Sequence, residues 1–428
     1  MRAQWRHCLL GAAVLLVAGP GRAQEYRTAR VSDVRGGLVV RGVSEDEFSY
    51  VERNAVLREG DTLWTDDKGS AEAELEYGSW LRLAEETKVE LRGLPPTGEL
   101  HLWAGSLYLD LSPQMPDGFR VRTPAGDIDV RPESVVRVDL SRDEQVRISV
   151  VHGLARVRTD GRGTELVGAG ERAYLLGGRV PDPPGLYNRQ DRDSFDHYHY
   201  GRVDYYVRRP VPAELDRGLV GARDLYDNGS WVVVDNSRYW RPRCDPGWRP
   251  YSAGYWSYLP DCGYTWVDYA PWGYLTSHYG RWLYRPTYGW LWSPGYTWGP
   301  SYVAWSSFGG YCGWAPLDPW NQPCYYGNFG GFVPGGGFGL SFGLGNVFVD
   351  FRSWTFCDYN RFYFGRHHRQ YWNNGPVFVT ANQIHLDPNG FRFGNDALSQ
   401  IGVPRERFRG LVAINGEEAK RRALRFDQ

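Results

Sequence analysis

The sequence predicts a mainly β protein with two β regions of different composition. In the N-terminal half, apolar and polar residues alternate in short runs separated by turn residues, which is typical of strands. Between Trp240 and Trp320 the chain instead places twelve of its 19 tryptophans, nearly all beside Gly, Tyr or Pro. Such phrases predict a second β domain of short strands and turns.

Length and charge limit the possible functions. A chain of 428 residues is long enough for two or three domains, each with its own core. The formal net charge of -1 argues against a nucleic-acid partner, because phosphate neutralisation dominates such binding.

Residues 1–23 have the pattern of a cleavable signal peptide. Arg2 and Arg6 precede an apolar run from Cys8 to Ala18, and Gly21-Arg22-Ala23 supplies small residues for cleavage after Ala23. No later stretch has about 18 uninterrupted apolar residues, so no integral membrane segment is expected after cleavage. We therefore expect a periplasmic or secreted protein.

Residues 27–180 predict an all-β roll or sandwich. The clearest strand has Ala71, Ala73 and Leu75 alternating with three glutamates, a period of two residues, and ends at the turn Tyr77-Gly78-Ser79. Strands of this length at this spacing favour a roll or sandwich.

The same region resembles a FecR-type domain. The phrases that carry the resemblance are Arg58 to Leu63, Gly69 to Ala71, Tyr77 to Leu83, Ala104 to Tyr108, Phe119 to Pro124 and Val146 to Gly153. One departure is Arg131 to Ser134, where the family usually has Gly-Thr. The resemblance implies a periplasmic β domain, best known from transmembrane regulators that relay signals to sigma factors. Because a signal peptide stands where those regulators have a membrane helix, we expect no sigma-factor relay.

Residues 181–223 predict a polar connector. The run from Asp191 to Arg209 has the spacing of a short amphipathic helix interrupted by Gly201. Asp196, His197 and His199 could be drawn as a metal site, but His-x-His on a helix points the two rings apart, so we expect no metal. The Asn228-Gly229 pair predicts a hairpin turn.

Residues 224–325 form the aromatic repeat domain. Their phrases of Gly, Tyr, Trp and Pro begin with Leu225 to Trp231 and end with Gly313 to Leu317. These phrases resemble a bacterial family of unknown function that often follows a FecR domain. Residues 326–347 are Gly-rich and predict either a flexible linker or tight β-turns. Residues 348–428 predict a C-terminal extension with further strands and a charged helix from Asn415 to Arg422.

Two interpretations of the aromatic repeat remain open. The rings could form the core of a meandering sheet, in which glycine lets backbones approach. Some could instead form an exposed platform for sugar rings of peptidoglycan or exopolysaccharide. The candidate ligand-binding residues are Trp272, Tyr274, His278, Tyr279, Arg281 and Trp282.

The cysteines of an exported protein are candidates for disulfides. The short-range pairs expected here are Cys244 with Cys262 and Cys312 with Cys324, which leaves Cys357 over. A zinc site is less favoured, because no C-x-x-C spacing is present.

An enzyme is the least favoured class. Asp261, Asp268 and Asp318 could be imagined as a glycosidase pair, but no glutamate lies between Cys244 and Asn346. The sequence thus predicts a non-enzymatic, cofactor-free envelope protein that recognises or scaffolds an envelope protein or polysaccharide, with glycan binding by the repeat domain as the alternative.

Overall fold

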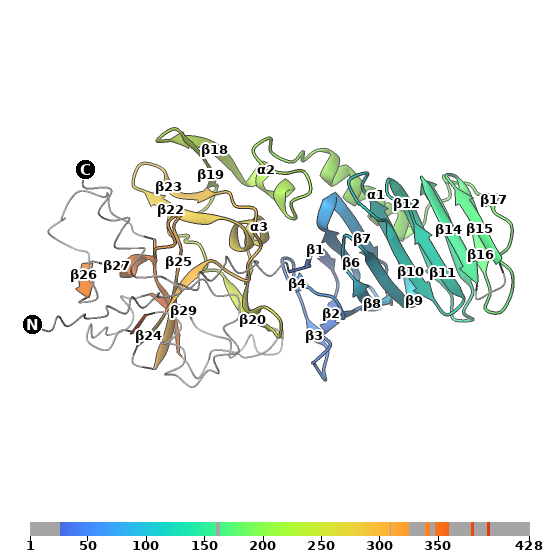
Figure 1. The fold of residues 1–428 in the computed structure, drawn as a ribbon, viewed down its shortest axis with the longest axis horizontal. Coiled ribbons are helices and arrows are strands. Elements are labelled where there is room, and N and C mark those ends of the chain that lie inside the picture. The colour runs from blue at the N-terminus through green and yellow to red at the C-terminus, as the bar shows by residue number, and fades with distance from the viewer. Residues whose placement is uncertain are drawn as a thin grey trace, which may run out of the picture.

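The computed structural model describes residues 26–159, 163–308, 310–324, 339–342, 347–358, 378–380 and 392–393. Two β regions lie side by side along the long axis of the molecule, joined by a segment with the longest helix (Figure 1). The mainly β fold class, with a second aromatic-rich region, is confirmed. The predicted signal peptide and the charged helix from Asn415 to Arg422 lie outside the described residues.

The first domain has two sheets, here called sheet A and sheet B. In spatial order, sheet A contains β4 (Val56–Leu57), β1 (Ala29–Arg35), β6 (Ser70–Leu75), β7 (Ser79–Leu83), β9 (Gly98–Leu111), β12 (Ser134–Leu140), β13 (Val146–His152), β16 (Glu171–Leu175) and β17 (Gly185–Leu186). Sheet B contains β3 (Ser49–Tyr50), β2 (Leu38–Arg41), β5 (Thr62–Thr65), β8 (Lys88–Gly93), β9, β10 (Phe119–Thr123), β11 (Gly126–Val130), β14 (Leu154–Thr159) and β15 (Gly163–Gly168). Within these sheets β9 and β10 pair in parallel and the other pairs are antiparallel.

Strand β9 passes from one sheet to the other. Its first half pairs with β8 and β10 in sheet B, and its second half pairs with β7 and β12 in sheet A. Gly105 at the crossing point has a φ of 84°, and a Cβ there would lie 2.3 Å from Thr87 Oγ1. Only glycine has both the conformational freedom and the small size that this crossing requires.

The space between the sheets is filled by aliphatic side chains. Ala71, Ala73 and Leu75 of β6 point inward, as their alternation predicts, and join a buried cluster that draws on both sheets. The η1 turn (Glu76–Gly78) then leads into β7 at the predicted turn. Periodicity alone was enough to identify this core.

In and just after the connector, the structure differs from the prediction in two places. Helix α1 (Ser194–Val207) continues through Gly201, where a Cβ would meet nothing within 4 Å, so the predicted interruption is wrong. Asn228 ends the short helix α2 (Leu225–Asn228), which follows η2 (Ala222–Asp224), and is not a hairpin turn. The hairpin instead turns at Asp235 and Asn236, both with positive φ.

The second domain is built hairpin by hairpin, as predicted. Its sheets are β18 (Gly229–Val234), β19 (Ser237–Pro242), β23 (Gly289–Ser293) and β22 (Arg281–Arg285); β20 (Gly254–Leu259) and β21 (Gly263–Asp268); and β29 (Phe378–Thr380), β28 (Thr355–Asp358), β25 (Tyr311–Pro316), β24 (Val303–Phe308) and β30 (Arg392–Phe393). Helix α3 (Gly273–His278), the η3 turn (Phe351–Ser353) and the pair β26 (Gly339–Phe342) and β27 (Val347–Asp350) complete the described elements.

Tryptophans face each other across these hairpins. Directly opposed pairs are Trp231 with Trp240, Trp256 with Trp266, Trp282 with Trp292 and Trp305 with Trp314. Glycine provides the room they need, because a Cβ on Gly254 would lie 2.7 Å from the Trp266 ring. The Gly-aromatic phrases are therefore the repeat of a packed aromatic core.

The C-terminal extension contributes to the same domain. Strand β28 pairs with β25, and β30 pairs with β24, so residues beyond 325 complete the sheet. Most of the predicted Gly-rich segment lies outside the described residues, apart from β26. No helix in the described residues is long and apolar enough to cross a membrane.

Candidate functional site: a buried charge network between the domains

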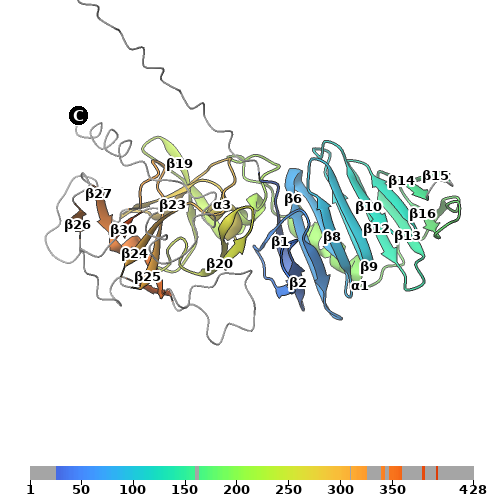
Figure 2. The same ribbon diagram turned by 60° about the horizontal axis from the view of Figure 1, so that its bottom comes forward.

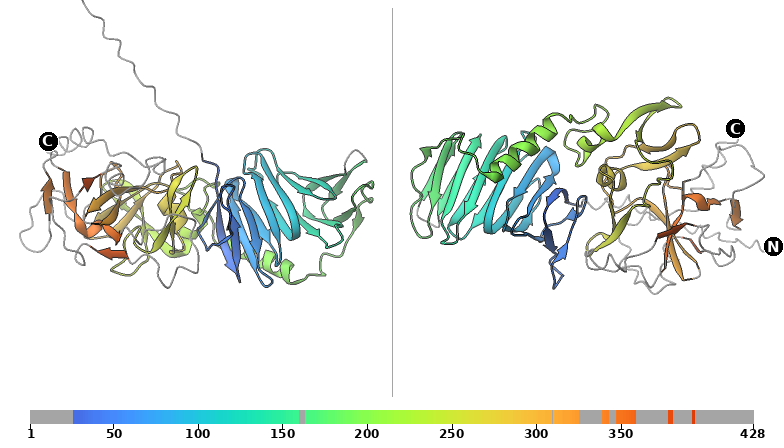
Figure 3. Two further views of the ribbon diagram at one scale, coloured as in Figure 1. Left: turned by 90° about the horizontal axis from the view of Figure 1, so that it is seen from below. Right: turned by 180° about the vertical axis from the view of Figure 1, so that it is seen from behind.

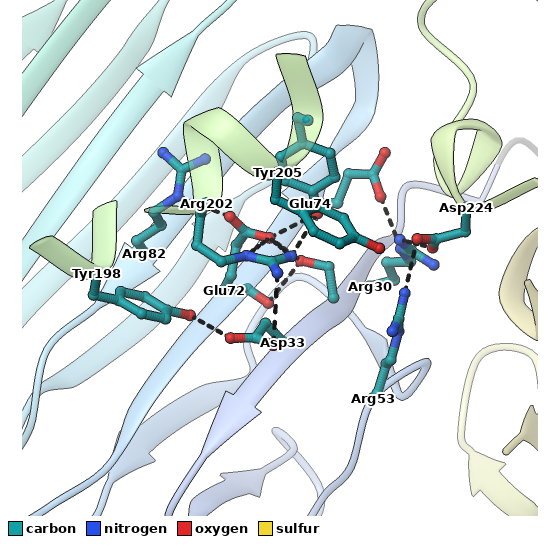
Figure 4. Close-up of polar contacts among 12 residues, drawn as sticks. Arg30, Asp33, Arg53, Glu72, Glu74, Arg82, Tyr198, Arg202, Tyr205 and Asp224 are labelled. Carbon is teal, nitrogen blue, oxygen red and sulfur yellow. Dashed lines mark hydrogen bonds and ion pairs between the residues drawn. The ribbon is translucent and has the colours of Figure 1, made fainter. Parts of the chain in front are cut away.

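The outer face of sheet A carries a network of charged side chains that are buried beneath α1 and the start of the second domain (Figure 4). Arg30 comes from β1, Glu72 and Glu74 from β6, and Arg82 from β7. Alternation along β6 turns both glutamates away from the aliphatic core. They are nevertheless buried, because α1 and the segment around Asp224 cover this face.

Glu72 is the centre of the network on the α1 side. Its carboxylate accepts hydrogen bonds from Arg82 Nε at 2.8 Å, Arg202 Nη2 at 2.7 Å, Tyr206 Oη at 2.7 Å and Ser32 Oγ at 2.7 Å. Burial by itself would raise the pKa of Glu72, but the two guanidinium groups lower it to about 2. The negative charge of Glu72 is therefore compensated by side chains of the protein itself.

Arg30 performs the same role on the side of the second domain. Its Nε donates to Glu74 at 2.8 Å, and its Nη2 forms an ion pair with Asp224. Asp224 also pairs with Arg53 Nη2 at 2.7 Å. Burial alone would lower the pKa of Arg30, but the charges of Asp224 and Glu74 raise it above the usual arginine range.

Helix α1 is positioned by its N-terminal cap and by sheet A, across whose strands it runs (Figure 3). Asp193 caps the helix in a reciprocal box with Asp196. Arg137 of β12 binds both carboxylates at 2.7 Å. The charged pair at the helix start thus anchors α1 to the sheet.

His199 lies inside this interface. Its ring stacks on Tyr108 with centroids 3.9 Å apart, and Arg82 Nη1 lies 3.0 Å from Nδ1. Because arginine can only donate, Nδ1 accepts and the ring is neutral. Burial, followed by the charge of Arg82, lowers the pKa of His199 to about 2.

Sequence reasoning missed this site. The signal was present in the spacing of Asp196, His199, Arg202 and Tyr206, which share one face of a helix. All four are buried. Reading Asp196 and His199 only as possible metal ligands concealed their role in packing against the sheet, and no group of three or more His, Cys, Asp or Glu in the described residues could hold a metal ion.

The six predicted ligand-binding residues do come together, on α3, β22 and the residues that flank them. Trp272 is 7%, Tyr274 0% and Trp282 2% exposed, and His278 and Tyr279 are also buried. These five do not form the exposed platform on which the prediction depended. Arg281, by contrast, is half-buried and lies 3.6 Å from the centroid of the Tyr302 ring.

Polar atoms of these residues serve the fold. Tyr274 Oη lies 3.0 Å from Thr28 Oγ1 of the first domain. His278 Nδ1 donates to Gly299 O at 2.8 Å, and burial lowers its pKa to about 4. Trp282 Nε1 donates to Thr276 O at 3.2 Å. These contacts indicate that the cluster is part of the aromatic core.

The disulfide prediction is contradicted. No disulfide joins Cys244 to Cys262 or Cys312 to Cys324 in the described residues. Cys244 is exposed, whereas Cys262 lies beside Arg58 Nη1 of the first domain at 2.7 Å. Cys324 Sγ contacts Trp282 O, and Cys312 lies opposite Cys357 across β25 and β28. Proximity in sequence was misleading, because the two cysteines of each predicted pair lie in different parts of the fold and contact different residues.

The three aspartates considered for catalysis have separate structural roles. Asp268 accepts from Trp266 Nε1 and the Ala270 amide, each at 2.8 Å, and burial raises its pKa to about 6. Asp318 accepts from the Trp320 and Gln322 amides, and burial raises its pKa to about 6 as well. Asp261 pairs with Arg58 at 3.4 Å.

Comparisons with known proteins divide the chain in the same way. Residues 61–156 match the family "FecR protein", and residues 222–321 match the "Family of unknown function (DUF6600)". The chain combines a FecR domain with a domain of unknown function. The FecR match lies within sheets A and B, and the DUF6600 match begins at Ala222, two residues before Asp224.

Solved structures similar to this chain include two crystal structures, at 1.65 and 2.50 Å resolution, of a "putative anti-sigma factor" from Parabacteroides distasonis ATCC 8503. Each is 15% identical with a TM-score of 0.26, covering 30% of this chain and 61% of that chain. The chain thus matches about three fifths of the length of those proteins. No curated protein matches the chain.

Proposed function

We propose that this FecR-type protein is a non-enzymatic component of the cell envelope, in which the FecR domain and the aromatic domain act as one recognition or scaffolding unit. The observation that carries the proposal is the buried network of Arg30, Glu74 and Asp224, which joins the two domains. A buried network of charges favours one relative placement, because any other leaves charges unpaired.

Other contacts support a fixed arrangement of the domains. Asn54 Nδ2 donates to the carbonyl oxygens of Asp268 and Ala270 at 2.9 and 2.8 Å, and Tyr26 packs edge-on against Trp298. Arg30 also lies over the ring of Tyr274. A chain built in this way presents both surfaces in a constant geometry, which suits a scaffold.

Export to the periplasm or beyond is part of the proposal and rests on the signal-like residues 1–23. An envelope location gives a recognition module access to envelope proteins and polysaccharides. The proposal includes no signal relay. The features that support the proposal are the contacts that join the two domains, and these concern binding and architecture.

Glycan binding by the aromatic domain has weaker support. Among the described residues of that domain, the exposed large aromatic residues are Tyr226, Tyr269 and Tyr296, which belong to three separate segments. The rings around Trp282 pack against one another, since Trp248 and Trp290 both meet its ring edge-on.

The test is Asp224→Lys in the full chain, with Asp227→Lys as the matched control. Asp224 is buried between two arginines, whereas Asp227, three residues on, pairs with Arg209 in a more exposed place. We expect the full chain in the envelope fraction and in a cross-linked envelope complex. Asp224→Lys should reduce the complex several-fold, while circular dichroism shows that both domains remain folded. A cytosolic chain, or an unchanged complex with Asp224→Lys, would contradict the proposal.

A further inference from the structure

The outer face of sheet B carries two exposed tryptophans. Trp64 on β5 is 44% exposed and Trp103 on β9 is 46% exposed, although most tryptophans of the described residues are buried. Strand β8 lies between them, since Trp64 faces Lys88 and Lys88 faces Ala104, the neighbour of Trp103. Two strand intervals separate the backbones at Trp64 and Trp103 by about 10 Å. Figure 2 shows β8 and β9 side by side.

Neighbouring side chains hold both rings in place. Trp103 stacks on His101 with centroids 3.8 Å apart and planes 11° apart, and its Nε1 lies 3.4 Å from Glu90 Oε2. Lys88 Nζ lies 5.5 Å from the centroid of the Trp64 ring, and Phe48 meets the ring edge-on. Rings that are already ordered lose little entropy on binding a ligand.

Eight charged side chains of this face form four ion pairs. The pairs are Arg92 with Glu90, Arg122 with Glu99, Arg120 with Asp129, and Arg158 with Asp127. Paired charges offer hydrogen-bonding groups and attract a charged ligand less strongly than unpaired charges would. Charged residues are also depleted from the centres of protein–protein interfaces, so Lys88 and Glu90 between the two rings argue against an apolar protein partner.

We propose that this face binds an uncharged polysaccharide by stacking its sugar rings on Trp64 and Trp103. Saccharides have flat C–H faces that match indole rings, and hydroxyl groups that match the polar side chains around them. The separation of the two rings suits two positions along one extended glycan chain. The inference rests on the proposed envelope function and assigns it a ligand class and a site distinct from the aromatic domain.

The experiment uses the full chain in affinity electrophoresis through gels containing laminarin, xyloglucan or dextran, all uncharged glucans. The variants are Trp64→Ala, Trp103→Ala and the double variant, with Trp64→Tyr and Trp103→Tyr as ring-retaining substitutions. Tyr296→Ala, an exposed ring of the other domain, is the control.

We expect at least one glucan to retard the wild-type chain. Each alanine variant should weaken binding about tenfold, which corresponds to about 1.4 kcal/mol, and the double variant should abolish it. The tyrosine variants should retain most of the binding, and high salt should leave it unchanged. Because both tryptophans are exposed, all variants should melt near the wild-type temperature.

Failure of any wild-type retardation, or retardation that survives the double substitution, would overturn the inference. Retardation that high salt abolishes would also overturn it, since a charged ligand would then be the better match. The envelope complex tested with Asp224→Lys does not depend on Trp64 or Trp103. The proposed function can therefore stand if the glycan site fails.

Discussion

Arg30 of β1 and Asp224 form a buried ion pair that attaches the FecR domain to the start of the aromatic domain. Glu74 and Arg53 extend the pair on either side. An isolated surface ion pair contributes little, whereas breaking a buried one leaves an uncompensated charge. The connection between the domains is thus sensitive to single substitutions.

Removing the charge at the centre of the network should destabilise the protein. Glu72→Gln leaves Arg82 and Arg202 only the part-exposed Asp110 and Asp33 as carboxylate partners, and we expect a loss of about 3 kcal/mol in the free energy of unfolding. Urea denaturation followed by circular dichroism measures it. Glu47→Gln, at an exposed glutamate, is the control and should change stability by less than about 0.5 kcal/mol. Equal effects of the two substitutions would mean that the network is solvated.

Stability should fall as the pH is lowered below the ordinary pKa of histidine. The folded protein keeps His199 neutral down to a pKa of about 2, whereas the unfolded chain binds its proton near pH 6.5. Between these values the unfolded state holds more protons, so His199 reduces stability by up to about 1.4 kcal/mol for each pH unit lowered.

His199→Gln tests this slope, because glutamine can accept from Arg82 but does not titrate. Between about pH 6 and pH 5, above the window of Glu72, the variant should lose less stability than the wild type. Urea midpoints at a series of pH values provide the comparison. His278 is buried and unchanged in both proteins, so parallel slopes would show that His199 is protonated in the folded state.

The crossing of β9 between the sheets should depend on glycine at position 105. In Gly105→Ala the new Cβ would lie 2.3 Å from Thr87 Oγ1 and 2.6 Å from Thr87 Cα, in addition to the strain of a positive φ. Gly178→Ala is the control, because its φ is 74° but its Cβ would meet nothing within 4 Å. We expect a loss of about 1–2 kcal/mol at Gly178 and clearly more at Gly105, measured by thermal melting. A Gly105 effect no larger than the control would argue against the crowding.

The aromatic core should be more sensitive than the surface rings of the same domain. Trp282→Ala removes a buried indole and should cost about 3–5 kcal/mol, whereas Tyr296→Ala should cost less than about 0.5 kcal/mol. Near-ultraviolet circular dichroism and urea titration report the two losses. A folded, equally stable Trp282→Ala protein would return that residue to the set of candidate ligand contacts.

Thiol labelling should distinguish the five described cysteines. Cys244 is exposed, and the other four are buried, with burial raising the pKa of Cys262 to about 12. Iodoacetamide applied to the folded protein should modify Cys244 alone, and all five should react after denaturation without a reductant. If mass spectrometry finds Cys312 and Cys324 still protected in denaturant, the disulfide predicted from sequence forms after all.

Much of the fold could be predicted from local patterns. The period of two at Ala71, Ala73 and Leu75 identified a core strand, since side chains on a strand must alternate between its faces. The spacing of the Gly-Trp phrases identified hairpins in the same way. Gly201 was misjudged, because the packing of α1 on sheet A outweighs the weak local preference of glycine. Asn228 instead ends α2, where its Nδ2 donates to Asp224 O.

The sequence by itself determined that this is a two-part β protein with a FecR-like region and a charge-poor aromatic region. Only the tertiary structure decided which side chains are hidden. Glu72 and Glu74 would be solvent-facing on an isolated sheet, but α1 and Asp224 cover them. Trp272 and Trp282 could have faced a ligand, but the neighbouring hairpins enclose them. Burial depends on contacts between residues far apart in the chain, which local periodicity does not encode.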